Sequence, residues 1–137
     1  RKEEPYLDVP IKDDDIRKVP LAVGSKFQLK NIYFDTDKFE LLPQSFLEMK
    51  NLLNIMHEHP KMIIEVIGHT DSIGRHNYNL YLSRKRAKAV VRYLNENGIS
   101  KTRTRYKGIG DAEPLDSNKT DEGRQRNRRV EVLILKM

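Results

Sequence analysis

The stretch from Gly68 to Ala87 reads GHTDSIGRHNYNLYLSRKRA and decides how the middle of this chain folds. Before it, residues 62–67 form an apolar, largely β-branched run interrupted only by Glu65, which predicts an inner strand covered on both faces. After a glycine-bounded turn, residues 77–97 predict a long helix that Gly98 caps. The stretch therefore joins an inner strand to a helix that packs on the same sheet.

Further elements extend this alternation in both directions. Residues 27–34 alternate between apolar and polar with one slip in parity, which predicts a strand with a bulge. Residues 103–107 predict an edge strand and residues 130–135 a last strand, with a short helical turn at residues 120–126. A first helix over residues 43–59 is predicted because apolar residues recur at steps of four and three, at Leu42, Phe46, Met49, Leu53 and Met56.

The order strand, helix, strand, helix, strand, strand predicts an α+β fold in which two main helices pack on one mixed sheet. Its strand-helix-strand crossovers are expected to be right-handed. A chain of 137 residues is long enough for one domain with a sizeable core. Residues 1–24 are rich in proline and charge and are expected to be a linker from an upstream domain, partly docked through Val19, Leu21 and Val23. The domain itself is then residues 25–137.

Composition narrows the possible functions. Cysteine is absent, so neither a disulfide framework nor a thiolate metal site is possible. The sequence has no apolar run of the length that spans a membrane. The formal charge of +6 favours an anionic partner, such as a nucleic acid, an acidic membrane surface or an acidic polymer, without choosing among them.

Two charged side chains stand out in the opening stretch. Asp71 lies in the turn after the inner strand, a common place for ligands in such sheets. Arg86 shares a helix stripe with Asn79 and Leu82 beside small residues, which predicts a guanidinium at a crevice edge. A carboxylate and an arginine held apart suit an amino-acid-like zwitterion. A local turn role for Asp71 and a solvated charge run around Arg86 are the alternatives.

Three blocks of this sequence resemble one known family. They are Gly68-His69-Thr70-Asp71, Asn79-x-x-Leu82-Ser83-x-x-Arg86-Ala87 and Gly123-Arg124-x-x-Asn127-Arg128-Arg129-Val130-Glu131, in that order. The pattern resembles the OmpA C-terminal family, which includes the peptidoglycan-associated lipoprotein and the flagellar stator protein MotB. The resemblance implies a domain that binds peptidoglycan through the diaminopimelate of its stem peptide and does not cut it. It also implies the periplasmic side of the outer membrane of a diderm bacterium.

The resemblance further implies a role for each site residue. Asp71 would receive the ammonium group of diaminopimelate and Arg86 its carboxylate. Outside the ligand, His69 is expected to shape the Asp71 loop, and Arg129 to lie at the surface beside the last strand. The other positions would line the ligand, with backbone N–H groups at Thr36 and Asp37, a polar contact at Asn79, an apolar wall at Leu82 and a nearby charge at Arg128.

Three other functions are weighed against binding to the wall. His57 and His59 are two residues apart at a helix end, so their rings point in different directions and no metal site is expected. No nucleophile with a base and no catalytic carboxylate pair is evident, so neither hydrolysis nor a cofactor is expected. A basic α+β nucleic-acid-binding domain is the runner-up, but its sheet would need more stacking aromatics than Tyr106.

Overall fold

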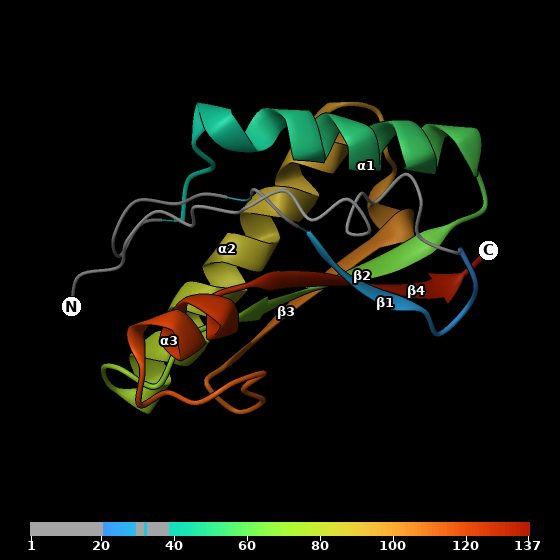
Figure 1. The fold of residues 1–137 in the computed structure, drawn as a ribbon. Coiled ribbons are helices and arrows are strands. Elements are labelled where there is room, and N and C mark those ends of the chain that lie inside the picture. The colour runs from blue at the N-terminus through green and yellow to red at the C-terminus, as the bar shows by residue number, and fades with distance from the viewer. Residues whose placement is uncertain (1–20, 30–31, 33–38) are drawn as a thin grey trace.

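The computed structural model describes residues 21–29, 32 and 39–137. Its strands and helices alternate in the predicted order, and the helical turn expected before the last strand is a helix of its own (Figure 1). The elements are β1 (Lys26–Leu29), η3 (Pro43–Ser45), α1 (Phe46–Glu58), β2 (Ile63–His69), α2 (His76–Glu96), η4 (Lys101–Arg103), β3 (Thr104–Gly110), α3 (Asp121–Asn127) and β4 (Val130–Lys136).

The four strands form one mixed sheet in the order β1-β4-β2-β3. β4 runs antiparallel to both β1 and β2, whereas β2 runs parallel to β3. The prediction that β2 is an inner strand and β3 an edge strand is therefore confirmed. Arg105 and Lys107 are exposed along β3, and such charges discourage edge-to-edge pairing. The handedness of the crossovers stays a prediction.

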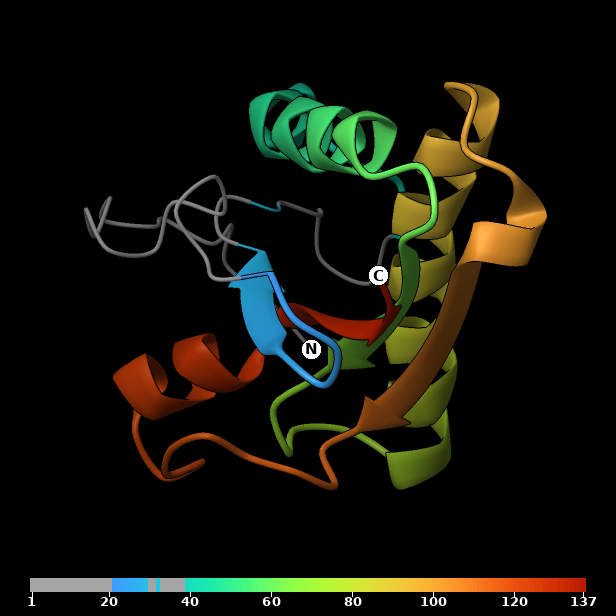
Figure 2. The ribbon, with the colours of Figure 1, turned by 90° about the vertical axis from the view of Figure 1, so that its right-hand side faces the viewer.

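Helices α1 and α2 cover one face of the sheet (Figures 1 and 2). The inward-facing residues, at every second position of the strands and every third or fourth position of the helices, pack together in a single buried cluster. The buried face of α1 is rotated from the predicted stripe, since Phe46 is 44% exposed and Leu53 only half-buried. The residues that fill the cluster include Leu52, Ile55 and Met56 of α1, Val90 and Leu94 of α2, Ile64 and Val66 of β2, and Val132 and Ile134 of β4.

Helix α2 approaches the sheet closely because glycines face it. A Cβ atom at Gly68 would lie 2.2 Å from Ser83 O, and one at Gly108 would lie 2.1 Å from Arg84 N. Ser83 is fully buried, and its Oγ accepts a hydrogen bond from Gly110 N at 3.0 Å. Two strand residues without side chains and one small helix residue thus set the spacing between α2 and the strand ends.

The chain before β1 packs on the sheet through Leu21, which is half-buried against the core cluster. Gly24 N donates to Ile134 O at 2.8 Å, and Ile134 N donates to Ser25 O at 2.9 Å. Val23 is 64% exposed and does not dock. Val19 and the rest of residues 1–20 lie outside the described residues, as does most of the first predicted strand beyond Leu29. Within the described ranges, none of the helices has the length and apolarity needed to cross a bilayer.

Candidate binding site at the Asp71 loop

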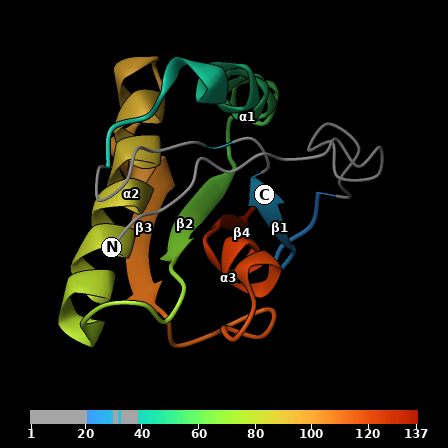
Figure 3. The same cartoon turned by 60° about the vertical axis from the view of Figure 1, so that its left-hand side comes forward.

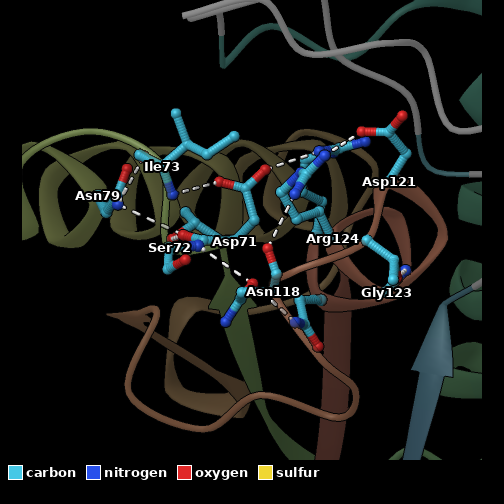
Figure 4. Close-up of polar contacts among 12 residues, drawn as sticks. Asp71, Ser72, Ile73, Asn79, Asn118, Asp121, Gly123 and Arg124 are labelled. Carbon is cyan, nitrogen blue, oxygen red and sulfur yellow. Dashed lines mark hydrogen bonds and ion pairs between the residues drawn. The ribbon is translucent and has the colours of Figure 1, made fainter.

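Asp71 lies in the loop that leaves β2 and leads to α2, and it is only 1% exposed. Its Oδ1 accepts a hydrogen bond from Ile73 N at 2.9 Å (Figure 4). The preceding backbone is tied to the sheet, because Thr70 N donates to Gly110 O at 2.8 Å and His69 N donates to Arg129 O at 2.9 Å. The local turn role considered for Asp71 is therefore present, and it engages Oδ1.

Arg128 supplies a charge partner for Asp71. Its Nη1 donates to Asp71 Oδ2 at 2.6 Å, and the two side chains are 12% and 1% exposed. Arg128 follows α3 directly, so this ion pair joins the end of that helix to a loop 57 residues earlier. A carboxylate this deeply buried needs such a countercharge. Within the described part of the chain, Asp71 is the one hydrogen-bond partner of the Arg128 guanidinium, which leaves further N–H donors for a ligand.

Asn127, the residue before Arg128, ties a third segment to the same loop. It is fully buried, and its Oδ1 accepts hydrogen bonds from Leu115 N at 2.7 Å and Asp116 N at 2.9 Å. Its Nδ2 donates to Asn118 Oδ1 at 2.9 Å. The same Asn118 oxygen accepts a hydrogen bond from Ser72 N at 3.2 Å (Figure 4). The Asp71 loop is thus held at two points, by an ion pair and by a bridging amide that the sequence did not reveal.

The predicted site residues of α2 are all buried. Arg86 is 4% exposed, which agrees with the prediction that its guanidinium does not lie in open water. Asn79 and Leu82 are fully buried. The Asn79 Nδ2 donates to Ile73 O at 3.0 Å and lies 3.4 Å from Asp71 O, so this side chain shapes the Asp71 loop from the helix side. Ligand contacts of these residues stay predictions, and Thr36 and Asp37 lie outside the described residues.

A second charged cluster is buried two residues from Asp71. His69 Nε2 lies 2.5 Å from Glu131 Oε1, and Arg129 Nε lies 3.4 Å from Glu131 Oε2. Arg129 is 7% exposed, so the prediction that it lies at the surface is wrong. Its guanidinium donates to Glu113 O at 3.0 Å, which ties the loop after β3 to the cluster. Burial raises the pKa of Glu131, but the contact with His69 and then the charge of Arg129 outweigh it and lower this pKa to about 2.

Acid is expected to destabilise the domain through Glu131. A carboxyl group with a folded pKa of about 2, against 4.5 ordinarily, stabilises the fold above pH 4.5, and this contribution is lost as pH falls towards about 2. The loss should be roughly 3 kcal/mol. Urea denaturation of the wild-type domain and Glu131→Gln across this range measures it. The variant should start less stable near neutral pH and lose less stability in acid, and parallel curves would contradict the assignment.

His57, His76 and the Ser83 hydroxyl each contact another group of the protein. The described residues contain no group of three or more His, Asp or Glu side chains placed to hold a metal ion. His57 Nε2 lies 3.3 Å from Asn97 O, and His76 Nδ1 lies 2.9 Å from Asp111 Oδ1. The Ser83 hydroxyl donates to Leu80 O at 3.0 Å and is buried under the sheet, so it is a packing residue rather than a nucleophile.

Known proteins are similar in sequence to most of this chain. The chain is 39% identical over 115 residues to outer membrane porin F of Pseudomonas fluorescens, a match that covers 84% of the chain and 35% of the porin. It is 33% identical over 103 residues to the peptidoglycan-binding protein ArfA of Mycobacterium bovis, covering 75% of the chain and 32% of ArfA. The chain therefore spans about a third of the length of these curated relatives.

The fold is shared as well. The crystal structure of the peptidoglycan-associated lipoprotein from Burkholderia pseudomallei superposes with a TM-score of 0.70 at 28% identity, over 75% of this chain and 87% of that one. By their names these are cell-envelope proteins, and the domain is one of the periplasmic side of the envelope. The model of the OmpA family matches residues 33–128, which include Asp71, Arg86 and Arg128. With more than half of its length matched, the chain belongs to the OmpA family.

Proposed function

We propose that this domain binds peptidoglycan without cleaving it, through the diaminopimelate residue of the stem peptide. By this contact it would anchor the protein that contains it to the cell wall, with residues 1–24 as the linker to an upstream domain. Support comes from the family and from relatives whose names state that they bind or associate with peptidoglycan.

The observation that carries this proposal is the ion pair between Asp71 and Arg128. The pair orients a carboxylate in a loop at the end of the sheet, beside a guanidinium that retains unused donors. The terminal carbon of diaminopimelate bears an ammonium and a carboxylate together. A neighbouring carboxylate and guanidinium match those two charges, and charge-assisted hydrogen bonds of this kind are the strong ones. Arg86, buried on α2, is proposed as a second donor to the ligand carboxylate.

The burial of Asp71 constrains how a ligand enters. Because Asp71 is 1% exposed, an ammonium group can reach it only when part of its cover moves. The Arg128 side chain, 12% exposed, is the charge that a ligand meets first. A zwitterion can divide this pair, with its ammonium on Asp71 and its carboxylate on Arg128, so that neither protein charge is left unpaired. A ligand with only one of the two charges would separate the pair and leave either Asp71 or Arg128 without a countercharge.

Purified sacculi test the proposed function. The wild-type domain should co-sediment with diaminopimelate-type sacculi, release no soluble muropeptides, and stay bound in about 0.3 M salt, because short contacts survive when diffuse attraction is screened within several ångströms. Glutamine at Arg84, Lys85 and Lys88 together should reduce capture only modestly. A wild-type domain that stays in solution would refute wall binding. A loss in the triple variant as large as that in Arg86→Ala would mean that surface charge, not a site, holds the wall.

A further inference from the structure

One flank of the molecule concentrates positive charge. It is formed by the solvent side of α2 together with η4 and the edge strand β3, which lie side by side in two views (Figures 2 and 3). Four of its cations line one open groove of about 930 Å³ between α2 and β3, namely Lys88, Arg92, Lys101 and Arg105. The one acidic residue in that lining, Glu96, is already paired, because Arg92 Nε donates to its Oε1 at 3.0 Å. We call these four residues together with Arg84 and Lys85 the basic flank.

Most cations of the basic flank form no ion pair with another described residue. Within the described residues, five of them have no acidic partner within ion-pair distance, namely Arg84, Lys85, Lys88, Lys101 and Arg105. Arg84, Lys88 and Arg92 follow one another at four-residue steps along α2, a spacing at which like charges repel by roughly 0.2–0.5 kcal/mol a pair. The repulsion between these like charges weakens the helix, so helix stability does not explain why three basic residues occupy these positions.

Several arginines elsewhere in the described chain have partners within the fold. Arg103 donates to the carbonyl oxygens of Met62, Met56 and His59 at 2.9, 2.7 and 2.7 Å, and so fastens the end of α1 to η4. Around α3, Arg124 pairs with Asp121, Arg126 with Asp116 and Arg128 with Asp71. Among the described residues, the cations outside the flank that also lack an acidic partner within ion-pair distance lie on separate segments, whereas the basic flank gathers five such cations on one side of the molecule.

We propose that the basic flank docks on a membrane surface that carries anionic phospholipid headgroups. Phosphate is an anion that lysine and arginine bind well, and each basic side chain near such a surface adds to the attraction. Five of the six cations are exposed and the flank extends over α2, η4 and β3, which suits an extended charged plane, and the domain belongs to the periplasmic side of the envelope. A nucleic acid is disfavoured because Arg84 already lies over the ring of Tyr106, at 5.2 Å, so the groove has no open stacking platform.

This surface is separate from the Asp71 loop. The groove lies along the C-terminal half of α2, between Lys88 and Glu96, whereas the Asp71 loop precedes the N-terminal end of the same helix. No residue of the groove takes part in the hydrogen bonds or ion pairs described around Asp71. The proposal is thus independent of peptidoglycan binding, and one domain can in principle hold a wall and a membrane at once.

Vesicle flotation tests the proposal with two variants of equal net charge. The flank variant carries Lys88→Glu, Lys101→Glu and Arg105→Glu, and the control carries Lys50→Glu, Lys61→Glu and Lys119→Glu, all at exposed positions. At low salt the wild-type domain should bind vesicles of phosphatidylcholine with about one-third phosphatidylglycerol, and not pure phosphatidylcholine. The flank variant should bind about 100-fold more weakly, from the loss of roughly 1 kcal/mol per basic residue. The control should lose less than about 5-fold.

Three results would overturn the proposal. The first is a wild-type domain that does not distinguish the two kinds of vesicle, and the second is an equal loss in both variants, which would reduce the effect to net charge. The third is flank-dependent binding to soluble polyglutamate without binding to vesicles, which would assign the flank to an acidic polymer or protein. Asp71→Asn should leave vesicle binding unchanged. A failure of wall binding in that variant therefore says nothing about the flank, and the reverse also holds.

Discussion

Asp71→Asn and Arg86→Ala should each abolish most of the capture of the domain by purified sacculi. Removal of one member of a charged contact at an interface costs about 2–5 kcal/mol, or roughly 30-fold to several thousand-fold in affinity. Asp71 is expected to lie towards the upper end, since it is 1% exposed and its loss also leaves Arg128 without its partner. Co-sedimentation over a range of sacculus concentrations, with thermal unfolding of each variant, measures both the binding and the fold.

Two neighbouring substitutions serve as matched controls. Arg84→Ala removes an arginine two positions from Arg86 on the exposed side of α2. Asp111→Asn removes a carboxylate, directly after β3, that contacts His76 at the start of α2. Both should sediment within about 3-fold of the wild-type domain, because Arg84 is exposed and has no ion pair to lose, and a surface pair such as that of Asp111 contributes little. If the folded Asp71 and Arg86 variants bind as these controls do, the site lies elsewhere on the domain.

Local periodicity explains why the order of the elements was predictable. The inner strand β2 and the long helix α2 are specified by side-chain spacings within a few residues, and these spacings survive in the structure. The face of α1 was predicted less well because Phe46, counted with the core, stacks on Tyr93 at the helix surface with ring centroids 5.8 Å apart. Which apolar residues of a helix face the core depends on the elements that pack against the helix. The spacing of apolar residues in the sequence carries no information about those elements.

The sequence predicted those residues of the candidate site that belong to one continuous motif. Asp71 and Arg86 come from a single stretch of twenty residues, whereas the Asp71–Arg128 ion pair joins positions 57 residues apart. The bridge from Asn127 through Asn118 to Ser72 likewise joins three segments and has no periodic signature. Such contacts are products of the tertiary fold.

Arg129 shows the same limit on prediction. In the sequence it reads as one member of a surface arginine run, from Arg124 to Arg129. In the structure it is buried beside Glu131, with its Nε 3.4 Å from Glu131 Oε2, and a buried carboxylate requires countercharge. Arg128 and Arg129 are adjacent in the sequence but pair with different carboxylates, Arg128 with Asp71 and Arg129 with Glu131.

Walls with diaminopimelate should be strongly preferred over walls with lysine at the same stem position. Both residues offer an amine to Asp71, but only diaminopimelate adds a carboxylate on the same terminal carbon. The proposed receptors of that carboxylate are Arg86, the unused donors of Arg128, and the backbone N–H groups predicted at Thr36 and Asp37. A site built around a polar group rejects an analogue that lacks it, because the donors of the site then stay unpaired.

The expected penalty is about 2 kcal/mol, or roughly 30-fold in affinity, since Arg128 is 12% exposed and water can replace part of the contact that its guanidinium loses. Calorimetric titration with two muropeptides that differ only at this residue measures it. Arg128→Gln separates the two arginines, because loss of discrimination in this variant with Arg86 intact would assign the carboxylate to Arg128. Equal affinity of the wild-type domain for the two muropeptides would mean that the wall is recognised by its amine or its glycan. The arginines beside Asp71 would then serve the fold and not the choice of ligand.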